Sequence, residues 1–464
     1  MKASNIGYEE ANLKKRLPVI NTTHAIMLSF LCAIAIGSLL LSLPISSADG
    51  KCVSFTDALF TATTSVCVTG LVTVPTATSW SLFGQVVILF LIQTGGLGII
   101  TVMSAFMIAL QKRMGIGDRL LLQDAFNLNS ISGVVRFVKR VVIGSLMIEG
   151  AGALLYMTVF VPEFGSRGIW ISVFNAVSAF CNAGMDIIGE NSLCNYVYHP
   201  LVNAVTASLI IVGGIGFIVW WDFIGILKRI PRQRSRALRM LTLHSKIVLT
   251  TTIILITSGA VLFFIFEFDN TATVGDASIF EKITFSLFQS VTTRTAGFAT
   301  VPQENLTDPS SMVSLFLMFI GGSPVGTAGG IKTLTFAILL AAAYSNIRGA
   351  NSTVMFGRTI SISDIIKAVT VVASSFAIVF ISTVLLLAVT NASILDVVYE
   401  TVSGTATVGL SRNLTSNLNN AGKAVMIATM YLGRIGPITL AIALNRKRSN
   451  PNVITNPTQE VCVG

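Results

Sequence analysis

The chain contains 464 residues, of which 53% are hydrophobic and 11% are charged, and its mean hydropathy is +0.77. This composition excludes an ordinary soluble protein and indicates a polytopic membrane protein. The net charge of +10 comes mainly from short segments between apolar runs, so we interpret it first as a signal of membrane topology and only then as a signal of binding partners.

The first apolar run covers residues 24–45, close to the ~20 residues with which a helix crosses ~30 Å of hydrocarbon. No small-residue cleavage motif follows it, which favours a spanning helix over a cleaved signal peptide. Three similar runs follow, at residues 141–161, 247–268 and 369–389. After each run, here named M1, comes a shorter and less hydrophobic stretch, too short to span and therefore predicted to be re-entrant. These stretches are residues 55–66, 169–181, 279–292 and 394–405.

Each re-entrant stretch leads into small and hydroxyl residues that end in a glycine. These glycines are Gly70, Gly184, Gly297 and Gly409, and their separations of 114, 113 and 112 residues indicate one unit copied four times. A second apolar run, M2, completes each unit, at residues 80–110, 201–226, 312–343 and 423–444. The predicted fold is an all-α polytopic membrane protein with four M1, re-entrant pore helix and M2 repeats around a central pore, similar to a potassium channel. The predicted segments are an N-terminus (1–23), repeats 24–112, 136–228, 244–345 with a broken second helix, and 366–446, and a C-terminal tail (447–464).

Lysine and arginine gather on one side of this topology. They precede the first M1, link each M2 to the next M1 and follow the last M2, as at Lys14, Arg113, Arg136, Lys139, Arg140, Arg234, Arg348, Lys367 and Arg446. By the positive-inside rule, both termini and the basic linkers are predicted to be cytoplasmic, and the glycine loops enter from outside the plasma membrane. Topology accounts for this charge without nucleic acid, although anionic lipid headgroups or an acidic partner surface could use it as well.

The six cysteines form no CxxC pair, so the sequence predicts neither a zinc site nor a disulfide framework. Cys52 and Cys194 fall on the predicted outer side, where a bridge between them stays open. The histidines His24, His199 and His244 lie at segment ends, and solvated or interfacial roles are expected for them.

Non-helical backbone inside a bilayer must be buried in protein or line a wet cavity, so the four glycine loops are expected to meet on one axis. Glycine permits conformations in which neighbouring carbonyls point one way. In potassium channels such stacked carbonyl rings replace the water shell of the ion, and these loops lack the acidic tips of a divalent-cation pore. Close packing through small residues is the alternative for one loop, but four copies in register favour a filter. The predicted filter residues are Cys67, Val68, Thr69, Gly70, Cys181, Asn182, Ala183, Gly184, Thr295, Ala296, Gly297, Thr407, Val408 and Gly409.

The M2 runs carry a second fourfold feature, a glycine motif that starts at Gly95, Gly213, Gly321 and Gly433. In the first two repeats the glycines are expected to bend or thin the helix, and only the third M2 is predicted to be strongly broken. There, five glycines and a proline in residues 321–333 oppose a helix, since each glycine costs ~1 kcal/mol and proline ~3 kcal/mol relative to alanine. This break predicts a gate below the filter, with relief of helix packing as the alternative.

The predicted gate residues are Gly321, Gly322, Ser323, Pro324, Gly326, Thr327, Ala328, Gly329, Gly330 and Lys332, the last as a counter-charge. The end of this segment is weakly similar to a phosphate-binding loop. Ile331 stands at the glycine position of that motif and no strand precedes it, so we reject this interpretation.

Two arginines lie next to these segments. Arg434 replaces the second glycine of the fourth M2 motif, and a charge at mid-span costs ~2.5–3.5 kcal/mol and usually faces a pore or a partner. We predict that it lies on the cytoplasmic side of the filter and raises the barrier to cations together with the gate. A buried pair with Glu149 is the alternative. Arg294 directly precedes the third loop and is predicted to brace this loop from behind.

These motifs resemble the Trk/Ktr/HKT superfamily of cation translocators over about residues 20–448, and within it the membrane subunits of bacterial Ktr potassium uptake systems. The resemblance rests on the four glycine loops, the segment ending at Thr333 and the lone Arg434. It implies a homodimer in which each protomer has its own pore and the cytoplasmic face binds a ring of nucleotide-binding, KtrA-like (RCK) regulatory subunits. It also implies that the C-terminal tail packs at the dimer interface.

The same resemblance implies that potassium is the transported ion and that no cofactor is covalently bound; activation by sodium stays open. Sodium-preferring HKT proteins resemble this pattern with serine at the first filter position, so Gly70 favours potassium. The alternative function is a sodium-permeable or ion-coupled cation symporter of the same superfamily. Secondary transporters usually contain inverted repeats, whereas these units run in one orientation. A membrane enzyme is disfavoured because the sequence has no HExxH or GxSxG motif and no paired carboxylates in a span.

Overall fold

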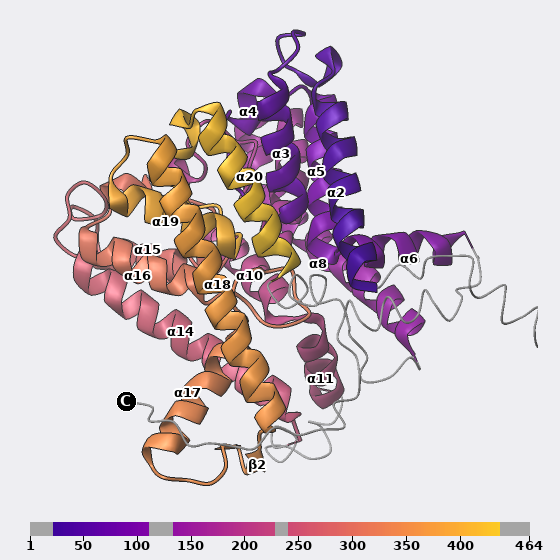
Figure 1. Cartoon of the computed structure of the whole chain (residues 1–464). Coiled ribbons are helices and arrows are strands. Elements are labelled where there is room, and N and C mark those ends of the chain that lie inside the picture. Colours follow the sequence, from indigo (N-terminus) through magenta and orange to yellow (C-terminus); the bar gives the residue numbers. More distant parts are fainter. Residues whose placement is uncertain (1–21, 111–132, 228–239, 437–464) are drawn as a thin grey trace, which may run out of the picture.

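The computed structural model describes residues 22–110, 133–227 and 240–436. Its elements are helices, apart from an antiparallel hairpin of β1 (Val354–Met355) and β2 (Arg358–Thr359) near the lower edge of Figure 1. The all-helical fold predicted from the sequence is confirmed. The N-terminal residues 1–21, the linkers 111–132 and 228–239 and the predicted C-terminal tail lie outside the described residues.

The first helix of each repeat is long and apolar. These M1 helices are α2 (Thr22–Leu41), α8 (Val134–Phe164), α14 (Leu243–Glu267) and α18 (Ile362–Val389). Large hydrophobic side chains such as Leu39, Leu154 and Phe376 are exposed on them, as expected where lipid is the solvent. α8 begins earlier than predicted and includes Arg136 and Lys139. Lysine and arginine are good helix formers, and their long side chains can carry the charged groups away from the apolar part of the helix to water.

A short helix follows each M1 helix. These pore helices are α3 (Phe55–Cys67), α9 (Ser166–Cys181), α15 (Ile279–Thr292) and α19 (Ile394–Ala406). α3, α15 and α19 begin with the serine N-caps Ser54, Ser278 and Ser393, each with an acidic residue in the first turn. Their C-terminal halves are buried in the protein. The partial negative charges of these C-terminal ends therefore lie in the interior, where they favour a cation.

The second helix of the first two repeats is sharply bent, so the prediction that only the third M2 is strongly broken is wrong. α5 (Leu82–Leu97) and α6 (Ile99–Ala109) meet at 99°, and α10 (Pro200–Ile215) and α11 (Phe217–Leu227) meet at 97°. Gly98 and Gly216 adopt φ angles of 86° and 96°, which side chains disfavour, and the helices turn there.

The third M2 segment also departs from a continuous helix. In the third repeat the gate segment separates α16 (Asp308–Phe319) from α17 (Thr333–Ile347), as predicted. α20 (Asn420–Ile435) ends next to Gly436, the last residue described. Within the described ranges, four single helices are long and apolar enough to cross a membrane, or six spans if each bent pair counts as one.

Short elements complete the loops around the pore helices. They are α4 (Thr76–Ser79) and the 3-10 turns η1 (Pro44–Ser46), η2 (Cys194–Tyr196), η3 (Gln303–Asn305) and η4 (Thr415–Asn417). Cys52 and Cys194 are both free thiols, so the bridge left open by the sequence is not formed.

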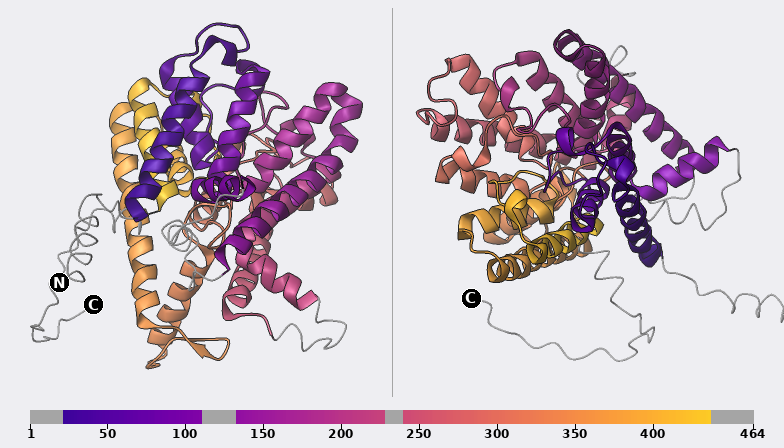
Figure 2. Two further views of the ribbon diagram at one scale, coloured as in Figure 1. Left: turned by 90° about the vertical axis from the view of Figure 1, so that its right-hand side faces the viewer. Right: turned by 90° about the horizontal axis from the view of Figure 1, so that it is seen from above.

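The four repeats form a closed ring, seen from above in Figure 2. The M2 helix of each repeat packs against the pore helix of the next, α5 on α9, α10 on α15, α16 on α19, and α20 back on α3. Polar contacts join every pair of neighbours. They are Trp170 Nε1 to Gln85 Oε1 (2.8 Å), Leu193 N to Ala299 O (3.0 Å), Arg412 Nη1 to Ser311 Oγ (2.7 Å) and Lys423 Nζ to Asp57 Oδ1 (2.6 Å). This ring places the ends of all four pore helices around one centre.

Candidate functional site

All four glycine loops have the same unusual backbone. The glycine itself and the residue two positions before it both have a positive φ, which residues other than glycine rarely adopt. The pairs are Val68 (55°) and Gly70 (96°), Asn182 (59°) and Gly184 (64°), Thr295 (71°) and Gly297 (84°), and Thr407 (53°) and Gly409 (97°). In an extended strand successive carbonyls alternate in direction, and left-handed residues at alternate positions can turn them to one side. Each loop can therefore present several carbonyls to one face.

The four glycines meet around one point. A Cβ atom built on Gly70 would collide with the carbonyl oxygen of Ala183, in the second repeat. The same collision continues around the ring, from Gly184 to Ala296, from Gly297 to Val408 and from Gly409 back to Thr69. Each filter glycine thus contacts the carbonyl before the next filter glycine, and the last repeat closes on the first. The sequence predicted this convergence, and the structure brings all four loops together.

Several polar side chains of these loops are buried with no hydrogen-bond partner among the described residues. They include Thr69 Oγ1, Thr295 Oγ1, Thr407 Oγ1 and both polar atoms of the Asn182 amide. Buried polar groups normally have partners. Thr407 Oγ1 lies next to Gly329 and the Asn182 amide nitrogen next to Gly214, so these two groups face the M2 glycines.

The gate segment is held by the broken M2 helix of the second repeat. Ser323 N donates to Gly214 O (2.9 Å), Thr327 N donates to Gly213 O (3.2 Å), and Phe217 N donates to Val325 O (2.9 Å). A helix break leaves backbone groups without their helical partners. The gate segment supplies hydrogen-bond partners for the backbone groups freed by the break at Gly216. The two irregular segments therefore satisfy each other's backbone hydrogen bonds.

Further bonds hold the gate segment beneath the filter. Thr327 Oγ1 donates to the carbonyl of Phe180, at the end of the second pore helix (3.0 Å), and Lys332 Nζ donates to Ala328 O (2.7 Å). The lysine therefore stabilises its own segment, and it forms no ion pair within the described part of the chain.

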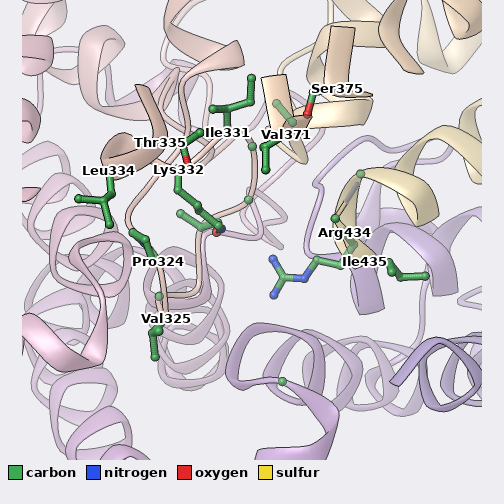
Figure 3. Close-up of a pocket in the computed structure, with 18 of the residues that line it drawn as sticks. Pro324, Val325, Ile331, Lys332, Leu334, Thr335, Val371, Ser375, Arg434 and Ile435 are labelled. Atoms are coloured by element: carbon green, nitrogen blue, oxygen red, sulfur yellow. The ribbon is translucent and has the colours of Figure 1, made fainter. Parts of the chain in front are cut away.

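Arg434 reaches from the fourth repeat to two others. Its Nη1 donates to Thr327 O (2.9 Å) in the gate segment and its Nη2 donates to Gly95 O (2.5 Å) in the first repeat. The alternative pair with Glu149 is not formed, because that carboxylate accepts from Gln93 Nε2 at 3.0 and 3.2 Å. Figure 3 shows the guanidinium projecting from α20 toward the gate segment.

Arg294 lies behind the third loop, and 8% of it is exposed. Its Nη2 donates to Gly321 O (3.3 Å), so it joins the third filter loop to the start of the gate segment. The prediction of a brace named the correct side of the loop but not this partner.

A cavity of about 740 Å³ adjoins the gate segment and Arg434 (Figure 3). Its walls include Phe30 of α2, Ile247 of α14 and Val371 of α18, together with gate residues such as Val325 and Lys332. It combines apolar walls with three basic side chains, Lys332, Lys367 and Arg434, and the acidic side chain of Asp364.

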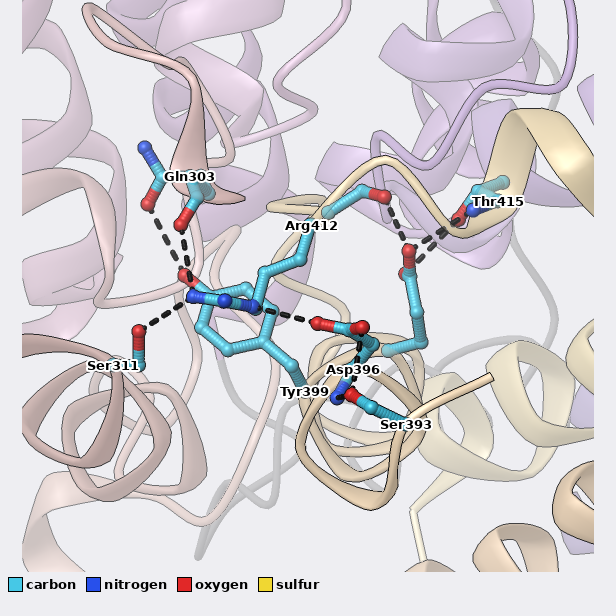
Figure 4. Close-up of polar contacts among 9 residues, drawn as sticks. Gln303, Ser311, Ser393, Asp396, Tyr399, Arg412 and Thr415 are labelled. Atoms are coloured by element: carbon cyan, nitrogen blue, oxygen red, sulfur yellow. Dashed lines mark hydrogen bonds and ion pairs between the residues drawn. The ribbon is translucent and has the colours of Figure 1, made fainter. Parts of the chain in front are cut away.

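A polar network lies on the far side of the fourth loop (Figure 4). Arg412 Nε donates to Asp396 Oδ1 (2.8 Å), and its Nη1 donates to Gln303 O (3.1 Å). The buried Glu400 accepts from Ser411 Oγ and from Thr415 N (3.0 Å). The sequence analysis did not predict this network around the fourth loop. The arginine three residues after Gly409 was the sequence feature that could have indicated it.

A helical membrane protein in which four carbonyl-bearing glycine loops meet around one point has the arrangement of the class of cation-conducting membrane proteins. The family model of TrkH, described as a cation transport protein, matches residues 17–453. The chain belongs to this family.

The chain aligns with relatives over nearly its full length. The chain is 40% identical to Ktr system potassium uptake protein B of Bacillus subtilis, covering 94% of this chain and 95% of the relative. It is 37% identical to potassium/sodium uptake protein NtpJ of Enterococcus hirae, covering 94% and 96%. The crystal structure of the potassium transporter TrkH from Vibrio parahaemolyticus matches with a TM-score of 0.74 at 17% identity, covering 93% of this chain and 86% of that one, which supports the fold.

Proposed function

We propose that this protein takes up potassium through a filter formed by its four glycine loops. The observation that carries the proposal is the ring in which each glycine contacts the carbonyl before the next, from Gly70 to Ala183 and finally from Gly409 to Thr69. Rings of carbonyl oxygens replace the hydration shell of a monovalent cation. The negative ends of the pore helices add a favourable potential at the same place. The family and the relatives support potassium uptake across the membrane.

Each repeat contributes its part of the filter. The residues are Cys67–Gly70, Cys181–Gly184, Thr295–Gly297 and Thr407–Gly409. Glycine at all four apex positions favours potassium, because a side chain there would displace a neighbouring carbonyl. A sodium-permeable function is the second candidate, since the relative NtpJ is named a potassium/sodium uptake protein.

The gate consists of residues 321–332 with Arg434 as its charged companion. Its support is the pair of bonds from Arg434 to Thr327 O and Gly95 O, which lets one guanidinium link three repeats below the filter. Conduction then requires Arg434 and the gate segment to move aside. The exchange of hydrogen bonds at Gly213, Gly214 and Phe217 would let the bend in the second repeat follow that movement.

The assembly is a homodimer in the plasma membrane with both termini in the cytoplasm, bound there by a ring of nucleotide-binding regulatory subunits of the KtrA-like (RCK) type. The basic residues on one side of the predicted topology support this orientation. Relatives named as proteins of Ktr systems support a regulated, multi-subunit assembly. The ion is the transported species and no cofactor is covalently bound; activation by sodium stays open.

The test is uptake of radiolabelled rubidium and sodium into proteoliposomes under an inside-negative potential. Rubidium flux that potassium blocks and sodium does not is the expected result. Sodium flux of similar size would favour the sodium-permeable alternative. Flux that strictly requires a proton gradient would overturn the channel-like mechanism and point to a coupled symporter. If flux appears only after the regulatory ring is added, the partner is obligatory.

A further inference from the structure

Each filter loop is held from behind by one hydroxyl residue near the end of its pore helix. These four residues, Thr64, Ser178, Thr292 and Ser403, are fully buried. The backbone carbonyl of each accepts the N–H group just before the filter glycine. The bonds are Thr69 N to Thr64 O (2.8 Å), Ala183 N to Ser178 O (2.8 Å), Ala296 N to Thr292 O (3.0 Å) and Val408 N to Ser403 O (2.8 Å). The four residues are therefore equivalent in structure.

In three repeats the side-chain hydroxyl accepts a backbone N–H of the loop, that of the filter glycine in the first and fourth repeats and that of the residue after it in the second. Gly70 N donates to Thr64 Oγ1 (2.9 Å), Gly409 N donates to Ser403 Oγ (3.0 Å), and Met185 N donates to Ser178 Oγ (3.1 Å). A buried N–H without a partner is unfavourable, and these three N–H groups have no other acceptor among the described residues. The hydroxyl thus keeps these N–H groups directed toward the helix and away from the axis.

The third repeat reverses the direction of this bond. Thr292 Oγ1 donates to the carbonyl of Phe298, the residue after Gly297, at 2.7 Å. Thr292 precedes its glycine by five positions, whereas Thr64, Ser178 and Ser403 precede theirs by six. A carbonyl that accepts from the pore helix cannot also point at the axis. The outer end of the third loop therefore differs from the other three.

We propose that Thr64, Ser178, Thr292 and Ser403 are positioning residues that set the carbonyl directions of the filter, and that the third repeat withdraws the Phe298 carbonyl from its outer end. This proposal rests on the filter assignment made above. It assigns to these hydroxyls an effect on ion selectivity, which a purely structural role in helix packing would not have.

The test compares variants of equal shape in the rubidium and sodium uptake assay. Thr64→Val replaces the hydroxyl by a methyl group and leaves the Gly70 N–H without its acceptor. The selectivity for rubidium over sodium should fall about fivefold, which corresponds to ~1 kcal/mol for one hydrogen bond. Thr64→Ser should restore it. The matched control is Thr63→Val, because the buried Thr63 hydroxyl donates only within α3, to Leu59 O (2.8 Å), and selectivity should not change.

The third repeat predicts an effect of another kind. Thr292→Val frees the Phe298 carbonyl to turn toward the axis, so the half-saturating rubidium concentration should fall, whereas Thr64→Val should not lower it. Ser403→Ala repeats the Thr64 deletion in the fourth loop, so a folding defect in one variant does not decide the outcome.

The controls separate this proposal from the filter assignment. If Gly70→Ala loses selectivity while folded Thr64→Val and Ser403→Ala keep it, the positioning role is wrong and the filter stands. If Gly70→Ala also keeps selectivity, the filter assignment itself is overturned.

Discussion

Lys423 and Asp57 form an ion pair of 2.6 Å that joins the last M2 helix to the first pore helix and closes the ring of repeats. Both side chains are mostly buried, with 14% and 15% exposed. The pair lies at the start of α20 and in the first turn of α3, so it fixes the outer ends of both helices. We expect it to contribute to the stability of the ring more than an ordinary surface pair does.

Lys423→Met should lower the stability of the detergent-solubilised protein by about 2 kcal/mol, because it leaves the Asp57 carboxylate without its charged donor. Thermal unfolding measures this effect. Lys367→Met is the matched control, since the pair of Lys367 with Asp364 at 3.2 Å is exposed and such pairs contribute about 0–1 kcal/mol. Equal shifts in the two variants would contradict the special role of the closing pair.

Gly70→Ser should weaken selectivity for potassium over sodium, because its Cβ would displace the Ala183 carbonyl and the native φ of 96° is unfavourable for serine. The ratio of rubidium to sodium uptake in proteoliposomes reports this change. Gly189→Ala serves as the control, since a Cβ atom there meets open space. A Gly70→Ser protein with unchanged selectivity would argue against the filter.

Arg434→Ala should raise rubidium flux at least about tenfold, the factor that 1.4 kcal/mol of barrier represents, because a fixed positive charge is removed from the pathway. Initial uptake rates measure the change. Arg434→Lys keeps the charge but not the fork that spans Gly95 O and Thr327 O, and an intermediate flux is expected. Unchanged flux in the alanine variant would show that Arg434 lies outside the ion path.

Thr327→Val should loosen the gate, because it removes the bond from Thr327 Oγ1 to the Phe180 carbonyl. Basal rubidium flux should rise, and deletion within residues 326–330 should raise it further. Thr335→Val is the control, as Thr335 lines the same cavity outside the gate segment. If the shortened loop only yields unfolded protein, relief of helix packing is the better account of its glycines.

We expect Asp186 to make uptake depend on external pH. It lies outside the spanning helices and two residues after Gly184, so it is within about 7 Å of the glycine ring along the chain. Burial raises the pKa of Asp186 to about 6. Above that pH the buried carboxylate adds negative charge close to the glycine ring, which should favour cations there, and below it the charge is lost.

Rubidium uptake should therefore fall between pH 7 and pH 5. Asp186→Asn should give a low rate that no longer changes over this range, whereas Glu190→Gln, at an exposed acid nearby, should behave like the original protein. A pH profile that survives in the asparagine variant would exclude Asp186 as its origin.

The repeat and its loops could be predicted from the sequence because the four glycines have a regular spacing and the apolar runs have the length of a bilayer. The ion pair of Lys423 with Asp57 could not be predicted from the sequence, because the two residues lie 366 positions apart. Neither residue type at its helix start indicates a distant partner. Long-range pairs of this kind leave no local pattern in one sequence.

The M2 glycines show a second limit of pattern reading. A Cβ atom on Gly95, Gly213 or Gly433 would overlap a carbonyl of a pore helix, so these glycines permit close packing. Gly98 and Gly216, three positions after two of them, instead permit a left-handed turn. Both uses require the absence of a side chain, so the residue type alone could not distinguish a glycine at a close packing contact from a glycine at a bend.

Joining the four units in one polypeptide removes a constraint that governs symmetric tetramers. In a pore built from four identical subunits, any residue near the axis appears four times, and four guanidinium groups facing one another would repel strongly. Because Arg434 occurs once, its guanidinium can act on the pathway while Gly96, Gly214 and Gly322 stand at the equivalent positions of the other repeats, although Lys332 lines the same cavity. Duplication followed by divergence has thus allowed each quadrant of the pore to specialise.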